Sequence, residues 1–176
     1  MKHENLIIGE ELERVHRFMS NNRIDFAVTG SMSLQMIGAF PPEENVRDID
    51  VITYFDTQEE KDRLEDLFRN LDELHGGWHD KMLKENNYQN PPYCFSIGDR
   101  GITINVWVFG KAHDEPIDTI DVKIDEKTYK VHTFRSAMHN KMRLMRKKDF
   151  IFQARLIRYI TQIGNKEIFN KKPIRF

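Results

Sequence analysis

The segment between residues 26 and 54 constrains the fold of this chain more than any other part of the sequence. It begins with the apolar run Phe26-Ala27-Val28, continues through Gly30-Ser31 into a helical stretch, and ends with Asp48-Ile49-Asp50 at the start of an alternating run. A strand that enters a helix through glycine and serine, followed by a second strand, is typical of proteins in which helices pack against a β-sheet. This order therefore predicts a sheet with helices against it.

Hydrophobic periodicity extends this order along the rest of the chain. Helices are predicted over about residues 5–21, 31–37, 57–71, 134–145 and 150–160, and strands over about 26–28, 48–54, 93–98, 102–109, 120–124 and 128–132. The last four strands form two candidate hairpins, because turn-forming residues separate the members of each pair. The result is an α+β (α/β) fold with a helical C-terminal part. Residues 74–92 allow either a strand or a helix.

Capping signals and apolar spacing add detail to the helices. Ser31 is predicted to cap the helix that ends near Ile37. Thr57, with Glu60 three residues later, is a capping box that predicts the start of the next helix. Apolar residues at helical spacing predict the two C-terminal helices: Phe134, Ala137, Met138, Met142 and Met145 for the first, and Phe150, Ala154, Ile157 and Ile160 for the second. Met138, Met142 and Met145 are expected in the core.

Composition favours one globular domain without a membrane segment. The chain has 176 residues, of which 39% are hydrophobic, and no run approaches the roughly 18 apolar residues of a spanning helix. The first five residues carry no apolar signal segment, and Cys94 is the single cysteine, so a cytoplasmic location is expected. We expect a core over residues 1–133 and a basic helical segment over residues 134–176, packed on the same domain.

Charge is distributed unevenly along the chain. Residues 135–176 hold 12 basic and 2 acidic side chains, whereas the preceding part holds 15 basic and 26 acidic ones. Such asymmetry can mark a surface for a nucleotide, a nucleic acid or another polyanion. Lys141 and Lys148 lie seven residues apart and can share a helix face, so they are candidates for phosphate contacts. The alternative is that these lysines form an ordinary solvated face.

The Asp48-Ile49-Asp50 triplet is the strongest chemical signal. Residues i and i+2 of a strand point to the same face, so Asp48 and Asp50 present two carboxylates side by side. This donor set suits Mg²⁺, which is commonly held by one or two carboxylates and by substrate phosphates. Gly30 allows close approach of the backbone to a phosphate, and Ser31 adds a hydroxyl at a helix start. Ordinary surface carboxylates and a plain helix cap are the alternative reading.

Other reactive residues give weaker signals. His75, His79 and Cys94 offer too few ligands for zinc, and the glycines after His75 oppose a helix that would place both histidines on one face. Trp78, Tyr88 and Tyr93 could stack on a base, although aromatic residues among proline and glycine more often pack a loop. Neither set predicts a site.

In these motifs, the sequence resembles the DNA polymerase beta-like nucleotidyltransferase superfamily. The similarity lies in Val28-Thr29-Gly30-Ser31 and in Arg47-Asp48-Ile49-Asp50-Val51. It is greatest to the small bacterial members related to abortive-infection toxins and drug-modifying enzymes. The segment from Asn140-Lys141 to Asp149 is similar to the lysine-bearing helix of that family and the basic stretch that follows it.

The resemblance implies a mixed sheet flanked by helices and a Mg²⁺-dependent reaction. Asp48 and Asp50 would bind Mg²⁺ at the triphosphate of a nucleotide seated at Gly30-Ser31. A nucleoside monophosphate would then pass from a nucleoside triphosphate to an acceptor, with release of pyrophosphate. The acceptor stays open among RNA, protein and small molecules.

One position departs from the family pattern. The third carboxylate of the family is expected on a later strand, where this chain has Asn105. An amide can accept a hydrogen bond or ligate a metal weakly, but it cannot take up a proton as a carboxylate does. Asp114 and Asp118 are possible substitutes. Together with the basic C-terminus, the departure leaves one alternative to an active enzyme, a member that binds nucleotide or nucleic acid without efficient turnover. A further alternative is a component of a toxin–antitoxin pair, in which the basic C-terminal helices dock an acidic partner.

Overall fold

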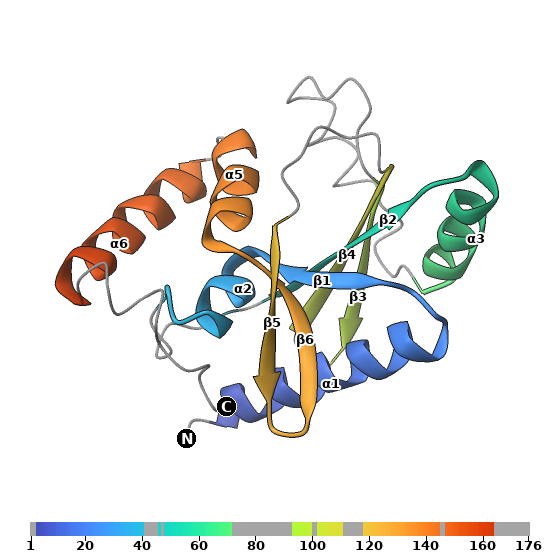
Figure 1. Ribbon diagram of the computed structural model, residues 1–176, viewed down its shortest axis with the longest axis horizontal. Coiled ribbons are helices and arrows are strands. Elements are labelled where there is room, and N and C mark those ends of the chain that lie inside the picture. The colour runs from blue at the N-terminus through green and yellow to red at the C-terminus, as the bar shows by residue number, and fades with distance from the viewer. Residues whose placement is uncertain are drawn as a thin grey trace. The chain divides into compact units, whose positions relative to one another are not determined.

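A computed structural model describes residues 3–40, 46, 48–71, 93–99, 102–110, 118–144 and 147–163. The elements, shown in Figure 1, are α1 (His3–Asn21), β1 (Phe26–Thr29), α2 (Gly30–Met36), β2 (Asp48–Phe55), α3 (Gln58–Arg69), β3 (Tyr93–Asp99), β4 (Ile102–Gly110), β5 (Thr119–Ile124), β6 (Lys127–His132), α5 (Phe134–Leu144) and α6 (Lys147–Ile163). Every helix and strand given a type by the sequence is confirmed, and residues 74–92 lie outside the described part. Among the described helices, none combines the length and the apolar character needed to cross a membrane.

The chain forms two compact units, each assembled from segments that are separate in the sequence. The first, called here the Gly30 unit, comprises residues 1–6, 27–46 and 116–176. The second, called the Asp50 unit, comprises residues 7–26 and 47–115. Residues 134–176, the predicted C-terminal segment, all belong to the Gly30 unit.

The Asp50 unit contains the strand order β3-β4-β2. β2 pairs with β4 in parallel, and β3 pairs with β4 in antiparallel orientation, which confirms the first predicted hairpin. Helix α3 contacts all three strands. Its Phe68 is fully buried, and the ring of Phe18 on α1 lies 6.3 Å from it, centroid to centroid. The core of this unit thus includes the contacts of α3 with the three strands and the packing of Phe68 against Phe18 of α1.

The start of α3 follows the predicted capping box with one difference. Thr57 is the N-cap residue, and its hydroxyl accepts a hydrogen bond from the Glu60 backbone N–H at 3.1 Å. The Glu60 carboxylate accepts from the backbone N–H of Asp56 at 2.9 Å, one residue before the position that a capping box would use. Two backbone donors near the helix start are thereby satisfied.

Replacing Thr57 by alanine is expected to lower the free energy of unfolding by about 1 kcal/mol, because the N–H of Glu60 loses its side-chain acceptor. Chemical denaturation of both proteins measures the difference. Thr57→Ser is the matched control, since serine retains the capping hydroxyl and should stay close to the parent. Equal losses for alanine and serine would show that the cap contributes little.

The Gly30 unit contains the strand order β1-β6-β5. β1 and β6 run parallel, with Val28 opposite Val131, and β5 and β6 form the second predicted hairpin. Asp125 takes a positive φ of 52° at the tip of that hairpin, a conformation that aspartate tolerates in turns. Helices α2 and α5 both contact β6. A buried cluster joins α2, the turn after it, α5 and α6, and it consists of Leu34, Ala39, Phe40, Ala137 and Leu156.

Helix α6 is confirmed, but the described apolar residues whose spacing predicted it do not face the core. Phe150 and Ile157 are 52% and 64% exposed, whereas Leu156 is buried and the ring of Phe152 lies 4.8 Å from that of Phe40. Apolar residues occur around most of this helix, so their spacing was compatible with more than one inward face. For α5, burial of Ala137 and packing of Phe134 and Met138 confirm the prediction. The side chains of Met142, Met145 and Ile160 lie outside the described part.

Candidate active site

Gly30 forms the turn between β1 and α2. Its φ of 70° lies in the left-handed region, which favours glycine because it has no Cβ. The carbonyl of Gly30 accepts a hydrogen bond from the Ser33 hydroxyl at 2.8 Å. The prediction that Ser31 caps this helix is wrong: α2 begins at Gly30, and Thr29 holds the N-cap position without a side-chain cap. The helix therefore begins two residues earlier than it would with Ser31 as its N-cap.

Thr29, the residue that precedes this turn, forms a buried polar contact with His132. The Thr29 hydroxyl and Nδ1 of His132 are 2.9 Å apart, across the parallel pair formed by β1 and β6. His132 is only 1% exposed, and its burial lowers the pKa of the imidazole to about 4, so the ring is neutral at pH 7. No hydrogen-bond partner for Nε2 is found in the described part of the chain. Sequence analysis missed His132, because nothing local indicates its pairing with Thr29.

Asp48 and Asp50 lie on one face of β2, as the alternation predicted. Ile49 and Val51 between and after them are fully buried, while both aspartates are half-buried. The strand therefore directs its apolar side chains into the core and its two carboxylates to the other face.

The neighbouring strand brings an amide and an indole to Asp50. Asn105 lies opposite Asp50 in the parallel register of β2 and β4. Its Nδ2 donates a hydrogen bond to Oδ1 of Asp50 at 2.9 Å, and Nε1 of Trp107 lies 3.5 Å from the same oxygen. Both donors hold this oxygen and so restrict rotation of the carboxylate. Asn105 was predicted from the sequence, whereas Trp107 was missed, although it is two residues further along the same strand face.

The carboxylates of Asp48 and Asp50 are suitable ligands for a magnesium ion. Asp48 and Asp50 supply hard carboxylate oxygens from adjacent positions of one strand face, and Mg²⁺ is usually held by one or two carboxylates together with waters and phosphates. The described residues contain no group of three or more histidine, cysteine, aspartate or glutamate side chains placed to hold a metal. The carboxylate pair is thus the donor set on which a metal proposal rests.

Two solved structures of the antibiotic-resistance factor ANT(2'')-Ia resemble this chain. A solution structure matches with a TM-score of 0.51 over 89% of this chain and 84% of the other. A crystal structure in complex with adenylyl-2''-tobramycin matches with the same TM-score over 90% and 91%. Sequence identity is 10% in both comparisons.

The fold is nucleotidyltransferase-like. The mixed sheet and flanking helices implied by the sequence resemblance are thereby confirmed. No family model matches the sequence, and no curated protein matches it. At this level of identity the likeness concerns the fold, and the narrower relation to abortive-infection proteins stays a prediction.

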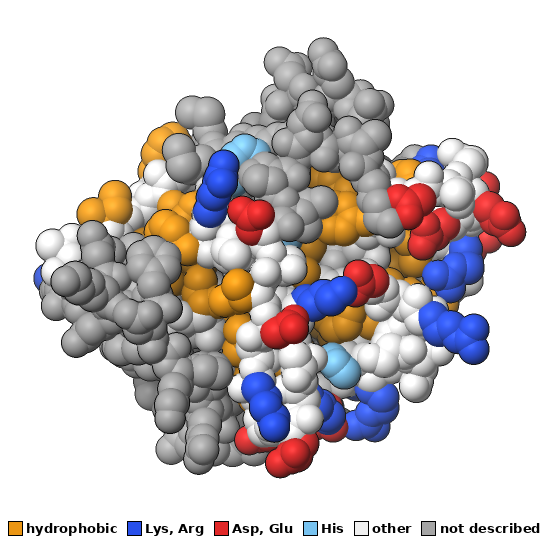
Figure 2. All heavy atoms as spheres, in the orientation of Figure 1, with side chains coloured by type: hydrophobic (Ala, Val, Ile, Leu, Met, Phe, Trp, Pro, Cys, Tyr) orange, Lys and Arg blue, Asp and Glu red, His pale blue; other side chains and the backbone are white. Residues whose placement is uncertain are grey.

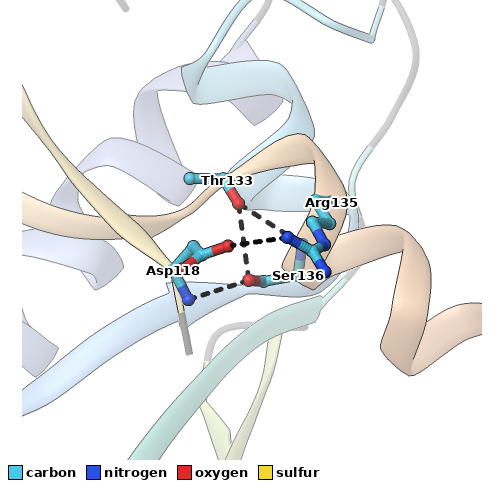
Figure 3. A network of polar contacts seen from close by, with 4 residues as sticks. All are labelled: Asp118, Thr133, Arg135 and Ser136. Carbon is cyan, nitrogen blue, oxygen red and sulfur yellow. Dashed lines mark hydrogen bonds and ion pairs between the residues drawn. The ribbon is translucent and has the colours of Figure 1, made fainter. Parts of the chain in front are cut away.

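Asp118 belongs to a network of polar contacts at the start of α5 (Figure 3). Its backbone N–H donates to the Ser136 hydroxyl at 3.0 Å, and its carbonyl accepts from the N–H of Thr133 at 2.9 Å. The carboxylate lies 4.0 Å from a guanidinium nitrogen of Arg135. These contacts connect the residue before β5 to the first turn of α5, which is a structural task. Asp114, the other proposed substitute for a third carboxylate, lies outside the described residues.

The remaining candidate side chains also lie outside the described part. Positions 141 and 148 fall within α5 and α6, but the side chains of Lys141 and Lys148 are not among those described. The same holds for His75 and His79, and for the side chain of Cys94 on β3. Phosphate binding by the two lysines therefore remains a prediction.

Proposed function

We propose that this protein is a Mg²⁺-dependent nucleotidyltransferase that moves a nucleoside monophosphate from a nucleoside triphosphate to an acceptor. The observation that supports the proposal most is the polar group on one face of β2 and β4, where Asp50 accepts from Asn105 at 2.9 Å and Asp48 lies two residues away. The likeness of the fold to ANT(2'')-Ia supports the same chemistry.

The proposal gives each residue a separate task. Asp48 and Asp50 hold Mg²⁺, and the hydrogen bond from Asn105 keeps the Asp50 carboxylate in one orientation. A bound Mg²⁺ ion neutralises charge on the phosphate oxygens and the leaving pyrophosphate. Gly30 and Ser31 contact the phosphates through backbone N–H groups and a hydroxyl, and Lys141 and Lys148 add positive charge.

The acceptor remains to be identified by experiment. The ANT(2'')-Ia crystal structure contains adenylyl-2''-tobramycin, in which a nucleotide is joined to an antibiotic. A small molecule with a free hydroxyl group is therefore one acceptor class to test here, beside RNA and protein.

Replacing Asp50 by asparagine is expected to reduce transfer by about 100-fold or more, because one metal-binding carboxylate is lost while shape and size are kept. The assay incubates the protein with labelled nucleoside triphosphates, MgCl₂ and pools of RNA, proteins or hydroxylated small molecules, and follows label in the product. Asp121→Asn is the matched control, since Asp121 is an exposed strand aspartate on β5 and its loss should leave transfer unchanged. Transfer that persists in Asp50→Asn, or that survives removal of Mg²⁺ by EDTA, would contradict the proposal.

The second candidate function is nucleotide binding without efficient turnover. It is favoured by Asn105, because the amide that contacts Asp50 lacks the basicity of a carboxylate. This alternative predicts Mg²⁺-dependent binding of a labelled nucleotide and no transferred label in any acceptor pool. Absence of nucleotide binding would exclude it together with the first candidate.

A further inference from the structure

Helix α6 carries an apolar stripe on its outer face. Phe150, Ile151 and Ile157 are 52%, 51% and 64% exposed, and Ala154 between them is exposed as well. Figure 2 shows hydrophobic side chains at the surface in the region of α5 and α6. The opposite side of the helix, through Phe152 and Leu156, already packs on the Gly30 unit. The exposed stripe is thus a second apolar face that the core of this unit does not use.

The spacing of this stripe is that of a helix–helix seam. Phe150, Ala154, Ile157 and Thr161 follow one another at intervals of four, three and four residues, which places them on one line along the helix. The line extends for about 16 Å at a rise of 1.5 Å per residue. The small side chain of Ala154 near its middle allows a second helix to approach closely. A partner helix with its own apolar stripe fits this surface better than a flat loop does.

Positively charged side chains at the border of the stripe favour a negatively charged partner. Arg158 is exposed beside it, and Arg155 is exposed further around the helix. Residues 150–163 contain no aspartate or glutamate. A second copy of this helix would bring like charges together, which is destabilising at such interfaces, whereas glutamate at the flanking positions of a partner would complement Arg158.

We propose that the outer face of α6 docks an acidic amphipathic helix of a partner protein. The apolar line of Phe150, Ala154 and Ile157 receives the apolar stripe of that helix, and Arg158 pairs with a carboxylate at its border. This interaction is independent of nucleotide chemistry, because it uses none of the residues assigned to Mg²⁺ or phosphate.

Fluorescence anisotropy of a labelled synthetic helix tests the proposal on the full chain. The probe has leucine at the seam positions and glutamate at the flanking ones, and a second probe replaces each glutamate by lysine. The glutamate probe is expected to bind at least about tenfold more tightly than the lysine probe. Ile157→Ser should weaken the glutamate probe by about tenfold or more, while the matched Ile120→Ser, which removes a 44% exposed isoleucine on β5, should not change it.

Reversal of one charge makes the test specific. Arg158→Glu is expected to weaken the glutamate probe and strengthen the lysine probe, and circular dichroism checks that each variant keeps its helix content. Equal affinity for both probes, or no binding of either, would overturn the proposal. Concentration-dependent self-association in sedimentation that Ile157→Ser abolishes would also overturn it, since the stripe would then serve a second copy of this chain.

Discussion

Replacing Asn105 by aspartate is expected to raise the rate of nucleotidyl transfer by about 100-fold or more, since a positioned general base typically contributes 10²–10⁴-fold. In the structure the Asn105 amide contacts Asp50 Oδ1 at 2.9 Å, so aspartate at this position places a third carboxylate beside the proposed metal pair. Single-turnover transfer of label from a nucleoside triphosphate, compared between the two proteins, measures the effect.

The same substitution has a second, opposite effect when Mg²⁺ is absent. Two carboxylates would face each other where an amide now donates a hydrogen bond, so the variant is expected to unfold at a lower temperature in EDTA and to regain stability with MgCl₂. Thr128→Asp is the matched control, because Thr128 is exposed on β6, a strand that does not pair with β2, and the substitution adds the same charge there. If Asn105→Asp binds Mg²⁺ but transfers label no faster than the parent, the amide does not limit catalysis.

Lowering the pH from 6.5 to 4 is expected to reduce the free energy of unfolding by about 3 kcal/mol through His132 alone, at 1.36 kcal/mol for each unit of pKa difference. Burial lowers the pKa of His132 from 6.5 to about 4, so the folded protein keeps the ring neutral while the unfolded chain protonates it. This contribution is present in full above pH 6.5 and is lost as the pH falls towards 4. Urea denaturation at a series of pH values measures it.

A variant comparison separates this effect from the titration of carboxylates. Asparagine at position 132 is uncharged and retains a polar atom near the place of Nδ1, so His132→Asn should show a smaller loss of stability over the same pH range. His139→Asn is the matched control, because it makes the same replacement at an exposed position. Identical profiles for His132→Asn and the parent would show that His132 does not cause the loss.

The local part of the fold followed from the sequence because periodicity and turn residues are local signals. The alternation of β2 placed Asp48 and Asp50 on one face, and Thr57 marked the start of α3. The strand order did not follow, since parallel pairing of β1 with β6 joins residues that are far apart in the chain. The side of α6 that faces the core did not follow from the sequence either, because apolar residues surround much of this helix. Only tertiary packing buries Leu156 and leaves Ile157 exposed.

Some residues of the candidate site could likewise be identified from the sequence, and others could not. The carboxylate pair was identified from strand alternation and Asn105 from the family resemblance, and the register of β2 and β4 then placed Asn105 opposite Asp50. Trp107 and His132 were not identified, because their contacts depend on neighbouring strands rather than on adjacent residues. The catalytic and binding roles of all these residues remain predictions that the variants above address.

The pairing of β1 with β6 has a consequence for synthesis of the chain on the ribosome. Thr29 and His132, which hydrogen-bond across these strands, are 103 residues apart. At about 5–20 residues per second, the first strand emerges roughly 5–20 s before its partner does. During that interval β1 lacks the neighbour that covers one of its edges. The hydrogen bond between Thr29 and His132, beside the Gly30 turn, therefore forms in a growing chain only after β6 has been made.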